Sequence, residues 1–593
     1  EMGGPFSGLK HFSKVLVFSA WEMVPRVIAT MLSYEAERRT VGELGKTTLK
    51  NSEERSVDAM PSYFPRPKKI RFPVPRLKFN LRDNNAPASM TLMSLTYPCV
   101  TLAKLYNPIS AMNQGLTKRQ IEAELRLKIE EKLSELEAQM TIGEGGGDDW
   151  YSLAPLLFDR GEAVIESWLK ESSLIPSFKN EEGVSSNKEN EGEEGADDAS
   201  IFELHFKKLR DVYQSSELPQ MGRRPQDLVD VLVKMAMASP AVCAMRLFGV
   251  DVVNAPGWSA VLAKVIVDRF NSQEATAIVE LTYGPREPHW KNALQYCSDG
   301  NIQAMLDEYA HILSDDNGLQ HSGDEVRARY LCQLMTSAIK THTANYNVDT
   351  YEKFRERIRN GEFKRKGSEK GERRYIKMRS GYAAGFYDMR GADKSVQRRD
   401  SLRRAFNSPF RPFVLASTSI GQEGLDFHHY CRKIVHWNLP ANPTELEQRE
   451  GRINRYKCLA IRQNVALKYG NDMKFSQDVW SEIFKMASND IQPGTKTSEM
   501  VPFWCLQGDA PIKIERIVPM YPLSRDQAKY ERLMKILSLY RLSLGQARQE
   551  ELLEYILQSN LNEEQIKELF INLSPHFRSI DDINTGRAGE ART

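Results

Sequence analysis

Three short apolar runs along the chain each end in polar residues, and each predicts a buried parallel strand. They are residues 14–18, followed by Ser19, residues 413–416, followed by Ser417 and Thr418, and residues 433–437, followed by Asn438. Continuous apolar runs of this length, without polar alternation, are typical of strands that are covered on both faces. Ligands of open α/β sheets bind at the carboxyl ends of such strands. The pattern therefore predicts an α/β sheet with a site where these polar residues stand.

A helix is expected after residues 433–437. Thr444 is its predicted N-cap, and Glu447 three residues later completes a capping box. Three side chains are then expected at positions i, i+4 and i+7 of one helix face: Gln448, Arg452 and Arg455. Gly451 keeps the backbone beside them open. Because two permanently charged guanidinium groups share this face, it requires an anionic partner.

These stretches resemble two motifs of superfamily-two helicases and Swi/Snf-type translocases. Residues 417–426, STSIGQEGLD, are similar to motif V, and residues 448–455, QREGRINR, to motif VI with its pattern Q-x-x-G-R-x-x-R. The two motifs occur in the family's order, about one strand apart, and such a pair is more specific than either alone. Residues 14–32 resemble motif IV, the first strand and helix of the second RecA-like lobe. An ordinary α/β domain with a basic helix is the alternative.

The resemblance implies the C-terminal half of an ATP-dependent helicase or translocase, with bacterial Swi/Snf-type proteins, some from phage-defence loci, as the nearest relatives. Arg452 and Arg455 correspond to arginines that reach the ATP phosphates from across the lobe interface. Gln448 is expected to position them or the attacking water. The residues expected at the nucleotide are Gly424, Asp426, Gly451, Arg452 and Arg455. The implied cofactors are ATP and Mg²⁺, both held chiefly by an N-terminal RecA-like lobe in cis.

The expected macromolecular partner is nucleic acid, with DNA favoured over RNA. Ser19, Ser417 and Thr418 are expected to face a backbone phosphate, a contact that carries no base preference. The most basic segment, residues 353–379, has two interpretations of equal weight. It is either a solvated hairpin whose glutamates pair with its lysines and arginines, or a phosphate-contacting patch that includes Lys364, Arg365 and Lys366.

The phosphate-binding loop of the family is not found in the sequence. Gly45-Lys46-Thr47 ends like a P-loop, but Thr40 stands where the pattern requires glycine, so a chance match is favoured. The sequence also begins at Glu1, near the point where a first lobe would end. We therefore expect a C-terminal fragment that does not bind Mg-ATP competently by itself.

Composition excludes several other classes of protein. The seven cysteines form no CxxC pair, which argues against a zinc or disulfide framework and suits a reducing cytoplasm. His428, His429 and Cys431 crowd together without further ligand spacing, so no metal site is predicted. No run of about 18 apolar residues predicts a membrane span, and the net charge of +2 means that any attraction to nucleic acid must come from local patches.

The predicted fold is a RecA-like parallel-sheet lobe, of the P-loop NTPase-type helicase C-terminal class, interrupted by a large mainly α-helical insertion and followed by a helical tail. The expected boundaries are residues 1–40 for the first strand and helix, 41–379 for the insertion, 380–470 for the rest of the lobe and 471–593 for the tail. An acidic loop near residues 180–198 is expected to be disordered, and residues 460–468 are a candidate closing strand.

Two other classes of function stay open. One is a non-hydrolysing adaptor that binds nucleic acid or a partner through a helicase-like lobe. The other is a subunit of a restriction or phage-defence nuclease. His205 and His289 each begin like a phospholipase-D-type motif, but Val212 and Tyr296 stand where the motif needs aspartate.

Overall fold

The computed structural model describes most of the chain. The described residues are 3–8, 12–43, 77–82, 87–140, 143, 147–176, 194–215, 218–340, 345–348, 355, 359, 376–386, 392–418, 425–471, 474–490, 499–506, 510–542, 555, 558–559, 562 and 565. The chain divides into two compact units. The helical unit comprises Glu1–Lys10, Leu32–Arg379 and Phe475–Gln477, and the sheet unit comprises His11–Met31, Ser380–Lys474 and Asp478–Thr593.

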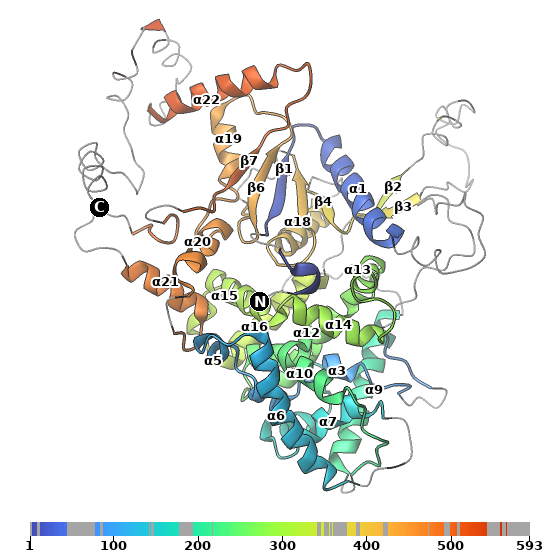
Figure 1. The fold of residues 1–593 in the computed structure, drawn as a ribbon. Helices are drawn as coiled ribbons and strands as arrows, with labels where there is room; N and C mark the ends of the chain where they lie inside the picture. Colours follow the sequence, from blue (N-terminus) through green and yellow to red (C-terminus); the bar gives the residue numbers. More distant parts are fainter. Residues whose placement is uncertain are drawn as a thin grey trace. The chain divides into compact units, whose positions relative to one another are not determined.

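The sheet unit is built on five parallel strands in the order β4-β5-β1-β6-β7 (Figure 1). Their bounds are Ala383–Phe386, Val414–Ser417, Lys14–Phe18, Cys431–His436 and Glu515–Ile517. In the central strand, Leu16 pairs with Leu415 on one side and with Ile434 on the other. The strands expected near residues 14–18, 413–416 and 433–437 are therefore confirmed, within two residues at each end.

Helices cover both faces of this sheet, as the apolar runs predict. On one face Leu16 and Phe18 pack with Leu402 and Phe406 of α18 (Ala392–Phe406). On the other face Val17 packs with Ile28 of α1 (Met23–Glu37). Successive residues of a strand point to opposite faces, so β1 is apolar at almost every position because both of its faces are buried.

The expected closing strand at residues 460–468 is wrong. These residues lie in a helix, α20 (Leu459–Tyr469), and the sheet is instead extended by β7, fifty residues further along the chain. Apolar side chains occur nearly all round α20, and Leu459, Ile461 and Val465 are all buried. An apolar run without clear periodicity fits a buried strand and a buried helix equally well, which explains the error.

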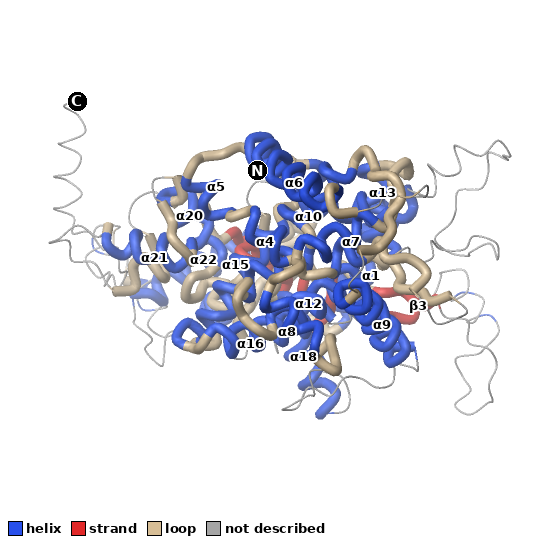
Figure 2. Tube along the Cα trace, turned by 90° about the horizontal axis from the view of Figure 1, so that it is seen from below, coloured by secondary structure: helices blue, strands red, loops and turns tan. Residues whose placement is uncertain are grey.

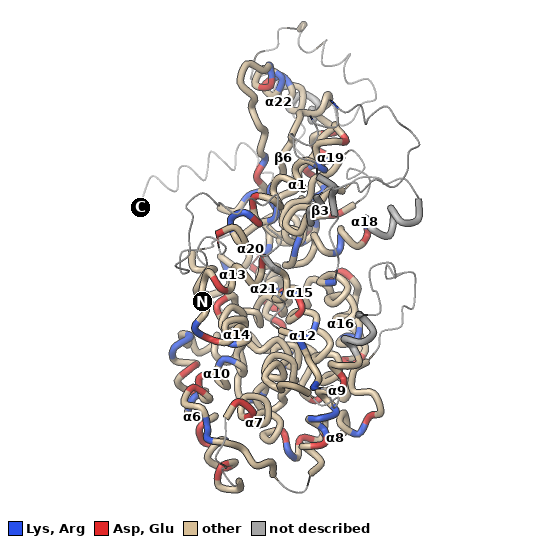
Figure 3. The backbone as a smooth tube through the Cα atoms, turned by 90° about the vertical axis from the view of Figure 1, so that its right-hand side faces the viewer, with Lys and Arg blue, Asp and Glu red and all other residues tan. Residues whose placement is uncertain are grey.

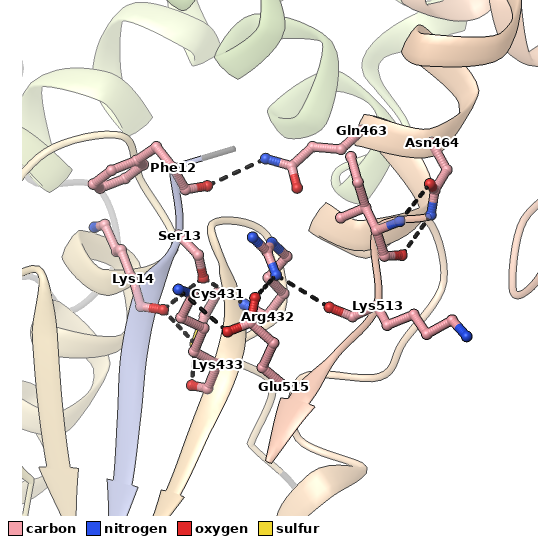
Figure 4. A network of polar contacts seen from close by, with 11 residues as sticks. Phe12, Ser13, Lys14, Cys431, Arg432, Lys433, Gln463, Asn464, Lys513 and Glu515 are labelled. Atoms are coloured by element: carbon pink, nitrogen blue, oxygen red, sulfur yellow. Dashed lines mark hydrogen bonds and ion pairs between the residues drawn. The ribbon is translucent and has the colours of Figure 1, made fainter. Parts of the chain in front are cut away.

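Side-chain hydrogen bonds fix β7 and α20 at the amino ends of the strands (Figure 4). Asn464 of α20 donates to the Ile512 carbonyl at 2.6 Å and accepts from the Ile512 amide at 3.0 Å. Arg432 of β6 forms an ion pair with Glu515 of β7, and its amide donates to Ser13 at 2.9 Å. The amino ends of the strands are thus occupied by contacts that hold β7 and α20 in place. The candidate site residues that follow the strands lie at the opposite, carboxyl ends.

Three further helices lie in the sheet unit. They are α19 (Pro443–Glu450), α21 (Val479–Asn489) and α22 (Asp526–Leu542). Leu439 and Leu446 pack against Leu533 and Leu537, which joins α19 to α22. Of the three helices, α21 and α22 lie within residues 471–593, where the sequence predicts a helical tail. Most of the tail after residue 542 lies outside the described residues.

Most of the helical unit is α-helix (Figure 2). The end of α1 continues into this unit from the sheet unit, and three short helical turns belong to it: η1 (Gly4–Phe6), η2 (Arg38–Gly42) and η3 (Leu319–His321). The other described helices are α3 (Met93–Thr96), α4 (Val100–Leu105), α5 (Pro108–Asn113), α6 (Lys118–Glu137), α7 (Trp150–Phe158), α8 (Ala163–Lys170), α9 (Glu194–Gln214), α10 (Leu228–Ala238), α11 (Pro240–Phe248), α12 (Ala255–Phe270), α13 (Gln273–Tyr283), α14 (His289–Asp299), α15 (Ile302–Asp316) and α16 (Asp324–Lys340). Two short antiparallel strands, β2 (Asn345–Val348) and β3 (Ile376–Arg379), accompany them.

The acidic loop expected near residues 180–198 is partly wrong, because α9 already begins at Glu194. Residues 180–193 lie outside the described part of the chain, as do most of residues 353–379. Along α6 acidic and basic residues are interspersed (Figure 3), and Arg224 pairs with Glu130 at 2.6 Å and with Glu137 at 3.4 Å. This helix therefore offers no surface of a single charge.

One segment of the helical unit, Leu228–Phe248, is long and apolar enough to cross a membrane. Its most apolar window of 18 residues has a mean hydropathy of 1.7, and 83% of that window is buried inside the protein. Ser239 separates it into α10 and α11. Because the core helices of soluble proteins have the same composition, this segment is weak grounds for a membrane span.

Candidate functional site

The three hydroxyl residues expected at a phosphate lie together at the carboxyl edge of the sheet. The Ser19 amide donates to the Ser417 carbonyl at 3.0 Å, which joins the ends of β1 and β5. Ser19, Ser417 and Thr418 are all buried, with exposed fractions of 2%, 0% and 6%. The Ser417 hydroxyl donates to the Thr418 carbonyl at 3.0 Å, and the Ser19 hydroxyl accepts from the Trp21 amide at 3.1 Å. These hydroxyls thus shape the strand ends in the structure as it stands.

Motif VI departs from the predicted helix at both ends. The N-cap is Asn442, whose side chain accepts from the Glu445 amide at 2.8 Å, so the prediction of Thr444 as N-cap is wrong. Pro443 occupies the first helical position, where no backbone N–H is needed. The helix ends at Glu450, and Gly451 is its C-cap.

Because α19 ends there, Arg452 and Arg455 do not continue the helix face that carries Gln448. They lie in the turns after the helix, whereas Gln448 is exposed within it. The predicted single face is therefore wrong. Its physical cause is Ile453, which is fully buried in the core beneath the sheet and so draws the chain away from the helix axis.

The structure brings Arg455 instead onto the carboxylate of motif V. Its Nε donates to Asp426 Oδ1 at 2.8 Å. The Phe427 amide donates to the Arg452 carbonyl at 2.9 Å, and Asn407 donates to the Asp426 carbonyl at 2.7 Å. Phe427 itself is buried in the core. Motifs V and VI are thus joined by one side-chain ion pair, Arg455 with Asp426, and by one backbone hydrogen bond, from Phe427 to Arg452.

Arg452 lies next to this pair and is buried, with an exposed fraction of 9%. Burial lowers its pKa, and repulsion from Arg455 lowers it further, against a smaller opposing effect from Asp426. Within the described part of the chain, its Nε has no hydrogen-bond partner. Asp426 is paired with Arg455, and a buried cation such as Arg452 without a full set of partners is costly. The donor set fits an additional anion such as a phosphate.

Arg449, which the sequence analysis did not single out, is another buried guanidinium of motif VI. It is 1% exposed, forms an ion pair with Glu445 and donates to the Asn438 carbonyl at 3.2 Å. It also lies 5.6 Å from the centre of the Phe18 ring. Burial lowers its pKa, and Glu445 opposes this effect. The spacing of Glu445 and Arg449, one helical turn, is the sequence feature that indicates this pair. Arg449 anchors α19 to the ends of β1 and β6.

Glu450, at the end of α19, anchors the same helix to β7. It accepts from Arg516 Nη2 at 2.8 Å and pairs with Arg516 Nε as well, and His436 Nε2 lies 3.4 Å from its other oxygen. Burial favours a higher pKa for Glu450, but the hydrogen bonds and charges of His436 and Arg516 outweigh it and lower the pKa to about 2. This network holds the base of motif VI in place.

The remaining predicted residues fall into two groups. Gly424, Lys364, Arg365 and Lys366 lie outside the described residues, and their roles stay predictions. The rings of His428 and His429 lie with their centres 4.0 Å apart and their planes tilted by 43°. Burial, followed by the charges of His429, Arg462 and Arg455, lowers the pKa of His428 to about 2. No group of three or more His, Cys, Asp or Glu side chains in the described ranges is arranged to hold a metal ion.

Comparison with known proteins gives one match. Residues 361–457 match the helicase conserved C-terminal domain, a segment of 97 of the 593 residues that includes β3, β4, α18, β5, β6 and α19. No curated protein and no solved structure matches the chain. The matched segment contains both motifs and four strands, three of them in a parallel five-stranded sheet with helices on both faces. Residues 361–457 therefore carry the conserved C-terminal domain of superfamily-two helicases, within an α/β lobe of RecA-like type.

Proposed function

We propose that this chain supplies the second RecA-like lobe of an ATP-dependent nucleic-acid helicase or translocase, with DNA rather than RNA as its track. The observation that carries the proposal is the pairing of Arg455 with Asp426 beside the buried Arg452. It places both motif VI arginines at the end of motif V, in a domain of a helicase family. Bacterial Swi/Snf-type proteins, including those of phage-defence systems, are the proposed subfamily, and the cytoplasm is the proposed location.

ATP and Mg²⁺ are the proposed cofactors, and Arg452, Arg455 and the backbone at Gly451 are the residues of this lobe that would hold the nucleotide. When bound, ATP supplies a γ-phosphoryl group whose transfer to water releases the free energy for movement. In such transfers the protein contributes positioning and charge stabilisation rather than covalent chemistry. Asp426 holds Arg455 by its Nε, which fixes the direction of the guanidinium fork. Gln448, exposed on α19, is proposed to orient the water.

The nucleic-acid side of the lobe is proposed to be the carboxyl edge at Ser19, Ser417 and Thr418. Only seven residues separate Thr418 from Asp426 in the sequence. A shift of the strand end at β5 would therefore reach the Asp426–Arg455 pair through a short connection. This connection is the proposed route by which nucleotide and nucleic acid influence one another.

The test of this function is a comparison of ATP hydrolysis by the chain alone and by the chain joined to its cognate P-loop lobe. We expect no nucleic-acid-stimulated hydrolysis by the chain alone, because no sequence in it matches the P-loop pattern. Joined to that lobe, it should hydrolyse ATP at a rate that rises with nucleic acid. Robust turnover by the chain alone would contradict the proposed division of the site, and nucleic-acid binding without turnover in the joined protein would favour an adaptor.

The basic segment offers a separate prediction. If Lys364, Arg365 and Lys366 contact phosphates, the triple alanine variant should flatten the plot of log affinity against log salt concentration by ~0.9 for each contact that is lost. Filter binding at four salt concentrations measures the slope. The matched control removes the same charge from the exposed residues Arg119, Arg126 and Lys128 of α6. Equal slopes for wild type and the segment variant would assign the segment to the solvated interpretation.

A further inference from the structure

Arg462 is a buried arginine of α20 that lies outside both helicase motifs, with an exposed fraction of 1%. Its Nη2 donates to the His429 carbonyl, and its Nη1 donates to the Lys457 carbonyl at 2.8 Å. The first carbonyl lies three residues after Asp426 of motif V, and the second lies two residues after Arg455 of motif VI. One guanidinium group therefore joins the two segments that carry the ion pair between the motifs.

The same two segments are also joined by backbone hydrogen bonds. The Phe427 amide donates to the Arg452 carbonyl at 2.9 Å, and the Leu459 amide donates to the His428 carbonyl at 3.1 Å. Backbone groups stay in every variant, so of these three links the Arg462 side chain is the one that a substitution removes. A guanidinium group is planar and its donors point in fixed directions. Arg462 therefore sets the distance between the two carbonyls that it binds.

One of these carbonyls belongs to a residue with an unusual backbone conformation. Lys457 has a φ of 47°, in the left-handed region that residues other than glycine rarely adopt. Its amide donates to the Phe503 carbonyl at 2.8 Å. Its Nζ lies 4.9 Å from the centre of the Phe484 ring and 5.7 Å from that of Phe503. Such a conformation persists where the surroundings impose it, and it is concentrated at functional sites.

We propose that Arg462 is a positioning residue for Arg455. By fixing the two carbonyls, it holds the Arg455 guanidinium on Asp426, in the orientation that a nucleotide phosphate requires. Because Arg462 is almost fully buried, it acts through the backbone and does not contact a phosphate itself. The inference rests on the proposed function and goes beyond it by assigning a role to a residue outside the motifs.

The alternative is that Arg462 stabilises the fold and has no separate effect on the motifs. Asn464, two residues further along α20, provides the matched comparison. It is also buried, with an exposed fraction of 4%, and its side chain also bonds backbone groups, those of Ile512. These bonds fix α20 to the chain before β7 and not to either motif. A purely structural role predicts that variants of the two residues behave alike.

The first measurement is the NMR signal of the Arg455 side-chain Nε–H in the full chain, assigned by its loss in Arg455→Lys. In wild type this N–H donates to Asp426, so its shift differs from that of a solvated arginine. We expect Arg462→Met, which keeps the length of the side chain without its donors, to move the signal toward the solvated value. Lys457→Val should do the same, because a β-branched residue is strongly disfavoured at positive φ. Asn464→Ala should leave the signal in place.

The second measurement is ATP hydrolysis by the chain joined to its cognate P-loop lobe, at a temperature below the unfolding transition of every variant. A displacement of about 1 Å at a reacting group can cost ~10²-fold in rate. Arg462→Met should therefore lower kcat by about that factor, with KM for ATP near wild type. Added to Arg455→Lys, it should lower kcat no further, because the same interaction is already lost. Asn464→Ala should keep kcat near wild type.

An Arg455 signal that stays unchanged in both Arg462→Met and Lys457→Val would overturn the inference. Effects of Arg462→Met and Arg455→Lys on kcat that multiply in the double variant would also overturn it. If Arg462→Met does not fold, Lys457→Val takes its place in both measurements. In each case, nucleic-acid-stimulated turnover by the wild-type joined protein would still support the proposed function. A wild-type joined protein without such turnover would contradict the proposed function itself, and so the role of Arg462 in it.

Discussion

Replacing Arg452 or Arg455 by lysine is expected to remove most ATP turnover from the protein that also carries the P-loop lobe. In phosphoryl transfer, charge spreads over the equatorial oxygens of the γ-phosphoryl group, and a planar guanidinium can hold two of them at once. An arginine of this kind typically contributes ~10³ to 10⁵ in rate, or ~4 to 7 kcal/mol of barrier. Lysine keeps the charge but lacks the fork, so it should recover little of this effect. Steady-state ATP hydrolysis measures the loss.

The matched control for these variants is Arg532→Lys, on the exposed side of α22. It makes the same chemical change at a solvated site, where a like-charge replacement costs almost nothing. Nucleic-acid binding without nucleotide should stay near wild type in all three variants, because neither motif VI arginine lies at the strand ends where the proposed nucleic-acid contacts are. Turnover at the wild-type rate in both Arg452→Lys and Arg455→Lys would show that these guanidinium groups do not take part in the reaction.

Glu450→Gln is expected to destabilise the sheet unit strongly. The substitution leaves the Arg516 guanidinium without its carboxylate, and removing one partner of a buried pair typically costs ~3 to 5 kcal/mol. Both side chains are 22% exposed, so the lower end of this range is expected. Urea unfolding, followed by the fluorescence of the tryptophans, measures the change. The control is Glu531→Gln on the exposed face of α22, where the free energy of unfolding should hardly change.

The same pair predicts how stability depends on pH. The pKa of Glu450 is lowered from its ordinary 4.5 to about 2, chiefly because the hydrogen bonds and charges of His436 and Arg516 outweigh its burial. A lowered carboxyl pKa contributes stability that is present above the ordinary value and is lost as the pH falls toward the folded value. The difference in unfolding free energy between wild type and Glu450→Gln should therefore be full at pH 6 and shrink between about pH 4.5 and pH 2. A difference that stays constant over this range would show that the carboxylate is not paired.

Local patterns predicted the central part of the sheet because β1, β5 and β6 are buried on both faces. Their continuous apolar runs, each followed by polar residues, are the direct consequence of that burial. The same patterns placed Ser19, Ser417 and Thr418 at one edge, and the structure joins the first two of these by a backbone hydrogen bond. The motif pair also directed attention to Asp426 and Arg455, which form an ion pair.

Features that depend on tertiary contacts were not predictable in this way. Glycine is compatible with both the interior and the end of a helix, so only the burial of Ile453 decides that α19 stops before Arg452. The edge strand β7 has just three residues and is not apolar throughout, so it carries no periodic pattern. In the helical unit, α7 carries no amphipathic pattern because it is apolar nearly all round, and it contains Pro155, a residue that argues against a helix interior.

ATP hydrolysis at the motif VI arginines is proposed to drive movement along nucleic acid. Displacement of a third strand from a DNA triplex tests it most directly, because a translocating protein removes that strand without having to separate the duplex. We expect displacement by the chain joined to its cognate P-loop lobe, dependent on ATP and lost in Arg455→Lys, with Arg532→Lys as active as wild type. Hydrolysis of ATP by the joined protein without displacement, or at a rate that nucleic acid does not change, would contradict the proposed coupling of hydrolysis to movement.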